Sequence, residues 1–558
     1  MMIYYLYSMI YMILSFKMFM LSLIFMYKNL NLFIEWNFII INSLNMNMFI
    51  LLDFMSMMFL SIVFMITSMI MIYSKEYMFY DKMNNYFIYI MNLFVLSMMI
   101  MIISPNLISI LFGWDMLGLT SYCLVIFYQN NQSFNSGMLT FLSNRLGDIF
   151  LIMSISLMSM MSSWNLFFFK FDNFMFILTL ILTSITKSAQ FPFSPWLPAA
   201  MAAPTPISSL VHSSTLVTAG IYLLIRFNYS ISQHMLTKYL LLISLITMFL
   251  SSLSANYEYD LKKIIALSTL SQLGLMMSIY SLNLQNLSFF HLLTHATFKA
   301  LLFMCSGVMI HNMMNFQDIR FMGNLINMFP MTIMMFNIAT LSLCGIPFMS
   351  GFYSKDLIIE YSLMMNLSFF TMMIFYLSIS LTMMYSIRLI YYLILNNYLF
   401  TPYMIMNENK TMNMPMILLM FMSTILGSMI NWMMFMSINF TYLNFYYKTL
   451  IFLCMIMSII MSLFFMKMKL MMKNFIMNFF FTKMWFIPNI QKFNNYMFFM
   501  LSKSIYLYIE KSWNEFMGFN YFKSLLLNNF MNKIFINKFL IIIYFSLYFL
   551  MMIMILLI

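Results

Sequence analysis

Long, continuous apolar runs set the predicted fold of this chain. Examples cover residues 50–73, 84–103, 236–254, 443–466 and 539–558. Each run is close to the roughly 20 residues that a helix needs to cross a bilayer. Strands of a membrane barrel would instead alternate polar and apolar residues over about ten positions. The pattern therefore predicts an all-α polytopic membrane protein with about 15–16 transmembrane helices.

The amounts of charge and proline divide the chain into five predicted regions. They are N-terminal transmembrane helices (1–104), a core with nearly all the intramembrane charge (105–395), two plain C-terminal spans (396–466), a basic segment (467–538) and a terminal transmembrane anchor (539–558). The first region includes a polar connector around Glu35–Asp53. Polar stretches at 128–137 and 401–414 are expected to be loops outside the membrane.

The basic segment 467–538 holds ten lysines against Glu510 and Glu515, interleaved with aromatic and aliphatic residues. One continuous helix over this length would extend on the order of 100 Å. We expect an amphipathic segment on the membrane surface, with its apolar side down and its lysines toward headgroups or partner proteins. Several short helices and loops fit the pattern equally well, and Pro488 is expected to interrupt the helix.

Composition supports a chain that is solvated mainly by lipid. Of its 558 residues, 63% are hydrophobic and 8% are charged, against about 25% charged residues in soluble domains. The first apolar run lacks a basic start and a cleavage site of small residues, so we expect a mature span. The absence of an Arg-rich presequence argues against import into an organelle by the usual route.

The sequence motifs of several chemistries are absent. The four cysteines, Cys123, Cys305, Cys344 and Cys454, form no C-x-x-C pair, so no iron–sulfur or zinc ligand set is encoded. No glycine-rich phosphate-binding motif occurs, and nothing indicates nucleotide binding. The formal charge of +12 fits contact with a membrane surface better than contact with nucleic acid. We expect no cofactor and no metal on this chain.

Two lysines stand beside helix breaks that are rich in proline or glycine. Lys187 ends the apolar run 176–187 and precedes five prolines, and Lys355 follows the stretch CGIPFMSGFYS. A cation at membrane depth costs about 2.5–3.5 kcal/mol on insertion scales and rarely persists without a task. Broken helices at that depth need cover from protein or from a water-filled cavity. Two such sites in corresponding halves of the chain predict an ion path built from repeats.

Each lysine also has a structural interpretation. In one reading Lys187, at the end of its helix, extends to the membrane interface; in the other, which we favour, it carries protons. Lys355 and Asp356 either cap the helix that resumes after the break, where an acid is favourable, or form a second site of the same kind.

Three further charges lie before the first break. Asp115 sits near the middle of the apolar run 105–127, where a carboxyl group is either held by a structural partner or kept neutral by burial, and in both cases can exchange a proton. Arg145 and Asp148 are three residues apart on one helical face and can pair directly. A permanent structural pair and a functional pair explain Arg145 and Asp148 equally well.

Histidines mark the remaining polar positions. His291, His295 and Lys299 recur every four residues and form one polar stripe on an apolar helix. The H-x-x-x-H spacing also suits a metal, but the glutamate of a zincin motif is missing and Lys299 would repel a cation. We therefore favour a proton relay over a metal site.

The segments 207–227 and 260–277 are rich in hydroxyl groups. His212 lies among serines and threonines, which either support a hydrated proton wire or simply satisfy the imidazole. Lys262 and Lys263 follow Asp260 and are expected to anchor a helix at the membrane interface. Polar side chains on the same helix are candidates to line a wet path: Ser268, Thr269, Ser271 and Gln272.

Together these segments resemble the antiporter-like subunits of respiratory complex I, in particular the NADH–ubiquinone oxidoreductase chain 5 family of animal mitochondria. The matching strings are GWDMLGLTSY, NRLGDI, KSAQFPFSPWLPAAMAAPTPISSLVHSSTLVTAGIYLLIRF, DLKKIIALSTLSQLGLMM, HLLTHATFKALLFMCSGVMIH, NFQDIR and GIPFMSGFYSKD. The resemblance is dense over 105–395 and extends as a pattern to both ends. One departure is Ala203, where many members carry an acid.

The resemblance implies two inverted five-helix repeats with broken helices, which form an antiporter-like proton-translocating core, and a C-terminal lateral helix. It places Asp115 where many members have glutamate. The residues that fall on family motifs, and are candidates for the proton relay, are Asp115, Arg145, Asp148, Lys187, His212, His291, His295, Lys299, Lys355 and Asp356.

The resemblance also implies a core membrane-arm subunit of NADH:ubiquinone reductase (H+-translocating) in the mitochondrial inner membrane. Such a chain carries no redox site; FMN, iron–sulfur clusters and ubiquinone are expected in other subunits, where electron transfer drives the protons. Expected partners are the other membrane-arm subunits, including a neighbouring antiporter-like subunit, and membrane lipids, with no nucleic acid. The alternatives are a stand-alone cation/proton antiporter subunit and a purely structural membrane anchor.

Overall fold

The computed structural model of the chain describes most of its residues. These are 2–41, 44–160, 163–165, 173–232, 234–365, 367–399, 408–435, 442–467, 475–516, 518 and 546–552. The chain divides into two compact units, Met1–Trp485 and Phe486–Ile558.

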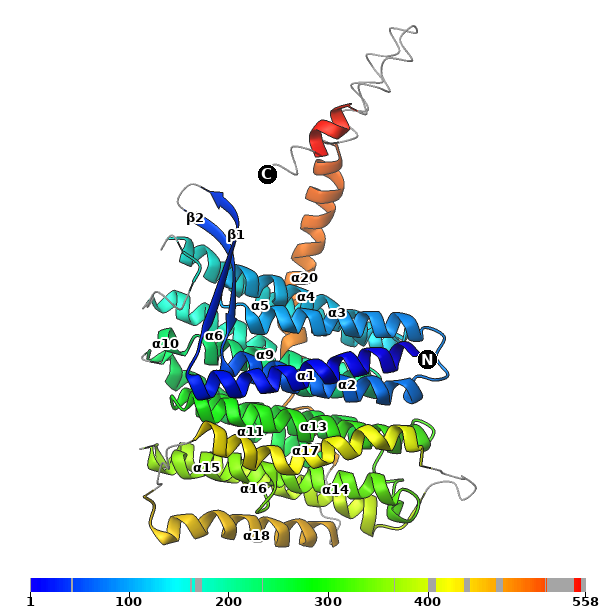
Figure 1. Ribbon diagram of the computed structural model, residues 1–558. Helices are drawn as coiled ribbons and strands as arrows, with labels where there is room; N and C mark the ends of the chain where they lie inside the picture. The colour runs from blue at the N-terminus through cyan, green and yellow to red at the C-terminus, as the bar shows by residue number, and fades with distance from the viewer. Residues whose placement is uncertain are drawn as a thin grey trace. The chain divides into compact units, whose positions relative to one another are not determined.

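The first unit is a bundle of long helices whose axes run roughly parallel (Figure 1). Within the described residues, twelve helical segments are long and apolar enough to cross a membrane: α1 (Met2–Lys28), α2 (Phe54–Tyr77), α3 (Asn84–Ile103), α4 (Leu107–Val125), α5 (Asn131–Ser159), the segment Thr205–Arg226, α11 (Leu236–Tyr257), α12 (Leu261–Ser281), α13 (Gln285–Asn312), the segment Phe369–Leu395, α17 (Lys410–Met434) and α18 (Phe445–Lys467). Two shorter apolar helices, α6 (Phe174–Lys187) and α14 (Pro330–Cys344), belong to the broken spans. The predicted helical membrane fold is confirmed, and the predicted last span 539–558 is described only at 546–552.

Three spans are enclosed by protein: the segment Thr205–Arg226, α12 and α13. They are rich in serine and threonine, whose hydroxyl groups donate to backbone carbonyls of the preceding turn. Ser268, for example, donates to the carbonyl of Ile265, and Thr269 to that of Ala266. Such local bonds satisfy a buried hydroxyl without a partner from another helix. The centre of the bundle is therefore more polar than its lipid-facing rim.

An antiparallel hairpin occupies the region that the sequence indicated as a polar connector. Strand β1 (Leu32–Ile41) pairs with β2 (Leu44–Leu52), and Leu32 lies opposite Leu52. The side-chain amide of Asn106, at the start of α4, donates to the carbonyl of Asn47 at 2.9 Å. The hairpin thus crosses the helix ends from α2 toward α4 (Figure 1). Its last residue, Leu52, is followed by Asp53, the N-cap of α2.

Two expected loops are shorter than the sequence suggested. α5 already begins at Asn131, because Asn130 and Ser133 form a capping box, and α17 begins at Lys410. Polar residues that looked like loop are therefore the caps and first turns of these helices. Residues 400–407 lie outside the described part of the chain.

The first break follows α6 and extends from Ser188 to Pro204. It contains the short helices α7 (Trp196–Ala199) and η1 (Ala200–Ala202). The chain then re-enters through α8 (Thr205–Ile207), the π-helix η2 (Ser208–Thr215) and α9 (Leu216–Arg226). The indole N–H of Trp196 donates to the carbonyl of Thr186 at 3.1 Å, which satisfies a carbonyl at the open end of α6.

The second break is shorter and turns on a glycine. α14 ends at Cys344, and α15 (Ser350–Met364) follows after five residues. Gly345 has φ +82° and donates its N–H to the carbonyl of Leu341 at 3.1 Å. This left-handed C-cap favours glycine because other residues have a Cβ that clashes. Both breaks that the sequence indicated are present.

The basic segment is interrupted, although not by Pro488 in the expected way. α19 (Phe475–Thr482) and α20 (Ile487–Ile505) are separate helices, and η6 (Tyr506–Asn514) continues α20. Pro488 lies in the first turn of α20, where a residue without an N–H is tolerated. Helix α19 closes the first unit, whereas α20 and η6 belong to the second. A single helix over 467–538 is excluded, and placement on the membrane surface remains a prediction.

Candidate functional site

A first group of charges lies where α4, α5 and α6 meet. The Arg145 guanidinium contacts Asp148 at 3.1 Å and Asp115 at 3.6 Å. The arginine and Asp115 side chains are about one-third exposed to the outside of this isolated chain, whereas Asp148 is buried. The predicted pair of Arg145 and Asp148 is therefore present, and Asp115 joins it from the neighbouring helix.

Lys187 completes this first cluster from the buried side. Its ammonium is fully enclosed, donates to the carbonyl of Trp114 at 3.3 Å and lies 5.0 Å from the centre of the Trp114 ring. Asp148 and Asp115 act on it electrostatically. The alternative in which Lys187 extends to the membrane interface is wrong, because the side chain points into the protein and meets α4.

Close helix packing places Lys187 at this point. A Cβ at Gly147 of α5 would lie 2.3 Å from the Thr186 hydroxyl, and one at Gly220 of α9 would lie 2.6 Å from the Ser184 carbonyl. Only glycine lets α5 and α9 approach α6 so closely, as is typical of helix contacts in membranes. These two glycines hold the end of α6, and with it Lys187, close to α5 and α9.

His212 lies on the π-helix η2, enclosed by protein. Its ring meets the indole of Trp196 edge-on, with 6.3 Å between the ring centres. Neither ring nitrogen has a hydrogen-bond partner among the described residues. The surrounding hydroxyls donate to their own backbone instead, as Ser214 does to Leu210 and Thr218 to Ser214. The expected neighbourhood is present, but direct hydroxyl–imidazole bonds are not.

The second cluster follows one face of α13. His291 Nδ1 lies 2.8 Å from the Ser354 hydroxyl on α15, and its Nε2 lies 3.2 Å from the side-chain oxygen of Gln272 on α12. The His295 ring lies 6.2 Å from the His291 ring. One turn further on, the Lys299 ammonium donates to the Ser268 hydroxyl. All three α13 side chains are enclosed, so the polar stripe predicted from their spacing faces other helices.

Lys355 belongs to this second cluster. Its ammonium donates to the carbonyl of Leu343, in the last turn of α14, where the helix dipole favours a cation. Lys355 acts electrostatically on Lys299 and on both histidines. Asp356 does not share this environment: it is half-buried on another side of α15, near Glu360 and Lys448. Geometry thus joins Lys355, but not Asp356, to the stripe.

Lys262 corrects the expectation of a pair of interface anchors. It is 5% exposed, and its ammonium donates to the carbonyl of Ala203 at 3.2 Å, at the end of the first break. Lys263 is 44% exposed and paired with Asp260, as an anchor should be. Adjacent lysines therefore face opposite environments, and the run DLKK gave no signal of which one turns inward.

His212 stands between the two clusters. Trp196 links it to Thr186, the neighbour of Lys187, and η2 packs directly on α13. Within the described residues, no hydrogen bond connects His212 to either cluster. The same part of the chain also brings no three His, Cys, Asp or Glu side chains into a group that could hold a metal ion.

Solved structures show the same fold. The chain superposes on a chain of the Mrp complex from Dietzia sp. DQ12-45-1b with a TM-score of 0.71 and 21% identity, over 90% of this chain and 59% of that one. It superposes on a chain of the membrane-bound sulfane sulfur reductase, an archaeal respiratory membrane complex, with a TM-score of 0.67 and 18% identity, over 77% and 90% of the two chains.

Family models match almost the whole length. The model described as NADH:quinone oxidoreductase/Mrp antiporter, TM, matches residues 104–382. The models for the NADH-ubiquinone oxidoreductase (complex I) chain 5 N-terminus and for the NADH dehydrogenase subunit 5 C-terminus match 36–88 and 385–558. Broken helices, buried lysines and these matches define an antiporter-like membrane subunit.

Sequence identity to individual relatives shows which antiporter-like family the chain belongs to. NADH-ubiquinone oxidoreductase chain 5 of Aedes aegypti is 46% identical over 519 residues, 90% of this chain and 89% of the relative. The same subunit of Lumbricus terrestris is 40% identical over 507 residues, 88% and 87% of the two chains. The chain belongs to the NADH-ubiquinone oxidoreductase chain 5 family.

Proposed function

We propose that this chain is a proton-pumping subunit in the membrane arm of NADH:ubiquinone oxidoreductase. The observation that carries the proposal is the complete enclosure of five ionizable side chains in the centre of a membrane bundle. They are Lys187, His212, His291, His295 and Lys299, each at most 1% exposed. Burying groups that can be charged is costly, so their concentration in one place needs a function.

Within each cluster, the charge on one ionizable group changes the affinity of its neighbours for a proton. Two unit charges 4 Å apart interact by about 4 kcal/mol at an effective dielectric of 20. A proton gained by Asp115 or Asp148 therefore weakens the hold on a proton at Lys187, and a proton on Lys355 repels one on Lys299. Alternate protonation and deprotonation of neighbouring groups would move protons along the bundle and release them on one side of the membrane.

His212 is the proposed connection between the two clusters. Its position on a π-helix agrees with the tendency of such segments to occur at functional sites. The proposed path runs from Asp115, Asp148 and Lys187 through His212 to His295, Lys299 and Lys355. Arg145 holds the two acids in place, and His291 is fixed by Ser354 and Gln272.

The driving energy comes from other subunits in this proposal. The chain carries no redox site of its own, and FMN, iron–sulfur clusters and ubiquinone bind elsewhere in the complex. The membrane is the mitochondrial inner membrane, as the resemblance to animal chain 5 implies. Its neighbours are further membrane-arm subunits, one of them antiporter-like, and lipids. A stand-alone antiporter is not favoured, because family models specific to chain 5 match both ends.

Replacement of the two break lysines tests the proposal. In the assembled complex, Lys187→Met and Lys355→Met should each lower the number of protons pumped per NADH, because methionine fills the space without binding a proton. Lys263→Met is the matched control, since Lys263 lies at the surface, and it should pump as the parent does. An unchanged proton-to-NADH ratio in both lysine variants would contradict the proposal.

A further inference from the structure

Helix α2 runs beside the segment Thr205–Arg226 and contacts it at both ends. At one end, Asp53, the residue before α2, pairs with Arg226, the last residue of α9. At the other end, the Tyr73 hydroxyl lies 3.4 Å from the Thr205 hydroxyl. The two contacts enclose the π-helix that carries His212.

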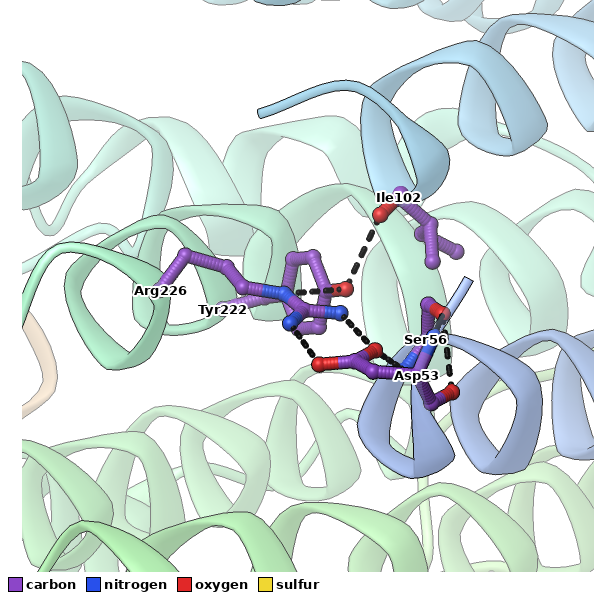
Figure 2. Close-up of polar contacts among 5 residues, drawn as sticks. All are labelled: Asp53, Ser56, Ile102, Tyr222 and Arg226. Carbon is purple, nitrogen blue, oxygen red and sulfur yellow. Dashed lines mark hydrogen bonds and ion pairs between the residues drawn. The ribbon is translucent and has the colours of Figure 1, made fainter. Parts of the chain in front are cut away.

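The Asp53 end is a closed network of five residues (Figure 2). Arg226 donates through both terminal nitrogens to the two carboxylate oxygens of Asp53 and through Nε to the Tyr222 hydroxyl. Tyr222 in turn donates to the carbonyl of Ile102 at the end of α3, at 2.9 Å. Asp53 also accepts from the backbone N–H of Ser56. The end of α9 is thereby tied to both α2 and α3.

The ion pair in this network is buried and permanently charged. The side chains of Arg226 and Asp53 are 9% and 15% exposed. Burial raises the pKa of Asp53, but the charge and hydrogen bonds of Arg226, with those of Ser56, outweigh it and hold that pKa below its usual value. Because this pKa is lowered on folding, the stabilisation is present above the unfolded value of about 3.9 and is lost only in strong acid. The contact does not switch in the pH range of respiration.

The Tyr73 end is packed against the second cluster's helix. A Cβ at Gly307 of α13 would lie 2.3 Å from the Tyr73 hydroxyl and 2.6 Å from the Thr205 hydroxyl. Only glycine at position 307 leaves room for both hydroxyl groups against α13. Both ends of the segment are therefore fixed to elements that do not carry His212.

Because both ends of the segment Thr205–Arg226 are fixed, the winding of the π-helix between them, residues 208–215, is fixed as well. Its i→i+5 bonds are less favourable than those of an α-helix, and such segments are usually single turns kept by their surroundings. Releasing one end would let residues 208–215 relax toward α-helical winding and rotate His212 about the axis. From this geometry we infer that Asp53, Arg226 and Tyr222 are positioning residues that hold His212 in register for proton transfer between the two clusters. The inference deepens the proposed function and rests on the role given there to His212.

A simpler interpretation is that Asp53 only caps α2. Asp53 and Ser56 form a capping box, which by itself would stabilise the helix. Two substitutions separate the interpretations. Asp53→Asn keeps an N-cap side chain, since asparagine caps as well as aspartate, but removes the charge that Arg226 needs. Ser56→Ala weakens the cap and leaves the ion pair intact.

The test is a double-substitution cycle on the assembled complex in sealed membranes. The quantities measured are protons pumped per NADH, the NADH oxidation rate and the amount of the chain present. Asp53→Asn should lower the proton-to-NADH ratio by the same factor as His212→Asn, and the double variant should be no lower than either one. Ser56→Ala should keep the parental ratio, and Asp53→Glu should recover part of it.

The other outcomes overturn the inference. If His212→Asn lowers the ratio while Asp53→Asn does not, positioning by Asp53 is wrong and the role of His212 stands. If the two effects multiply, Asp53 does not act through His212. If His212→Asn has no effect, both ideas about His212 fail, while the lysine variants still test the proposed function separately. Should Asp53→Asn prevent assembly, Tyr222→Phe, which keeps both charges, takes its place in the same cycle.

Discussion

The cations of this protein differ in what accepts their hydrogen bonds. Lys187, Lys262 and Lys355 donate to the neutral backbone carbonyls of Trp114, Ala203 and Leu343. Arg145 and Arg226 instead pair with carboxylates. A carbonyl stabilises an ammonium without cancelling its charge, so a lysine held this way can lose its proton and keep its place. We expect the carbonyl-held lysines to be the mobile part of the charge and the arginine pairs to be fixed.

This distinction predicts the effect of a permanent charge at the first break. Arginine is always protonated in proteins, so Lys187→Arg should allow assembly but lower the protons pumped per NADH as far as Lys187→Met does. Lys263→Arg, at the surface, is the control and should have no effect. A Lys187→Arg complex with the parental ratio would show that only the charge at this position matters, and not its release.

The correction at Lys262 gives a second prediction at the scale of single residues. Because Lys262 is enclosed and Lys263 is exposed and paired, a water-soluble amine reagent should modify Lys263 at least tenfold faster in the native chain. After unfolding in detergent, the two rates should become similar. Mass spectrometry of the peptide around 260–272 measures both. Equal native rates would place Lys262 at the interface after all.

Residue identity alone indicated most of the charged cluster members, because a charge within an apolar run stands out. It could not show which side chains meet. Asp53 and Arg226 are separated by 173 positions. In the sequence alone, neither differs from any other charged residue at the end of a helix. Asp356 shows the opposite error: it is adjacent to Lys355 in sequence but lies on another side of α15.

At the scale of elements, the contacts of α6 decide where Lys187 lies. Gly147 and Gly220 allow α5 and α9 to approach, but they face different obstacles. A methyl group at 147 would meet the Thr186 side chain, whereas one at 220 would meet the backbone of Ser184. Overpacking of this kind costs typically about 1–3 kcal/mol. Only the first collision can be relieved by changing a side chain.

The resulting prediction is a pair of variants with different rescue. Gly147→Ala should lower both thermal stability and pumping, and adding Thr186→Ala should restore most of each. Gly220→Ala should lower thermal stability and pumping to a similar extent. No substitution of Ser184 should restore them, because the obstacle there is the backbone carbonyl. Gly118→Ala is a control for thermal stability alone, because its added methyl group would make only an ordinary contact, at 3.8 Å, and that contact is with the Lys187 ammonium. Thermal unfolding of the purified complex and proton counting measure these effects, and failure of Thr186→Ala to rescue would contradict the proposed contact.

Helices could be located from the sequence where a long apolar run was the dominant signal. Apolar runs located α2, α3, α11 and α18 within a few residues. The hairpin β1–β2 was missed, because its alternation of aromatic, aliphatic and polar residues over 32–52 was outweighed by the surrounding spans. The start of α5 was missed because asparagine and serine signal a cap as well as a loop.

At the scale of the whole molecule, the C-terminal unit has a surface without an assigned partner. Lys503 and Lys511 lie on α20 and η6, and both are exposed. If this segment attaches the chain to acidic headgroups or partner subunits, Lys503→Glu together with Lys511→Glu should release the chain from the complex at lower salt than the parent requires. Native electrophoresis over a salt series measures this. Unchanged release would remove the lysines from the attachment.

In the proposed function, the two buried clusters and His212 form one path for protons, and protons cross such gaps through water. A density map of the assembled complex, detailed enough to show ordered waters, is the decisive measurement. We predict a chain of waters that connects Lys187, His212, His295, Lys299 and Lys355, with hydrogen-bond spacing between successive oxygens and nitrogens. A dry, fully packed interior between Lys187 and Lys299, with His212 in contact only with carbon atoms, would contradict the account.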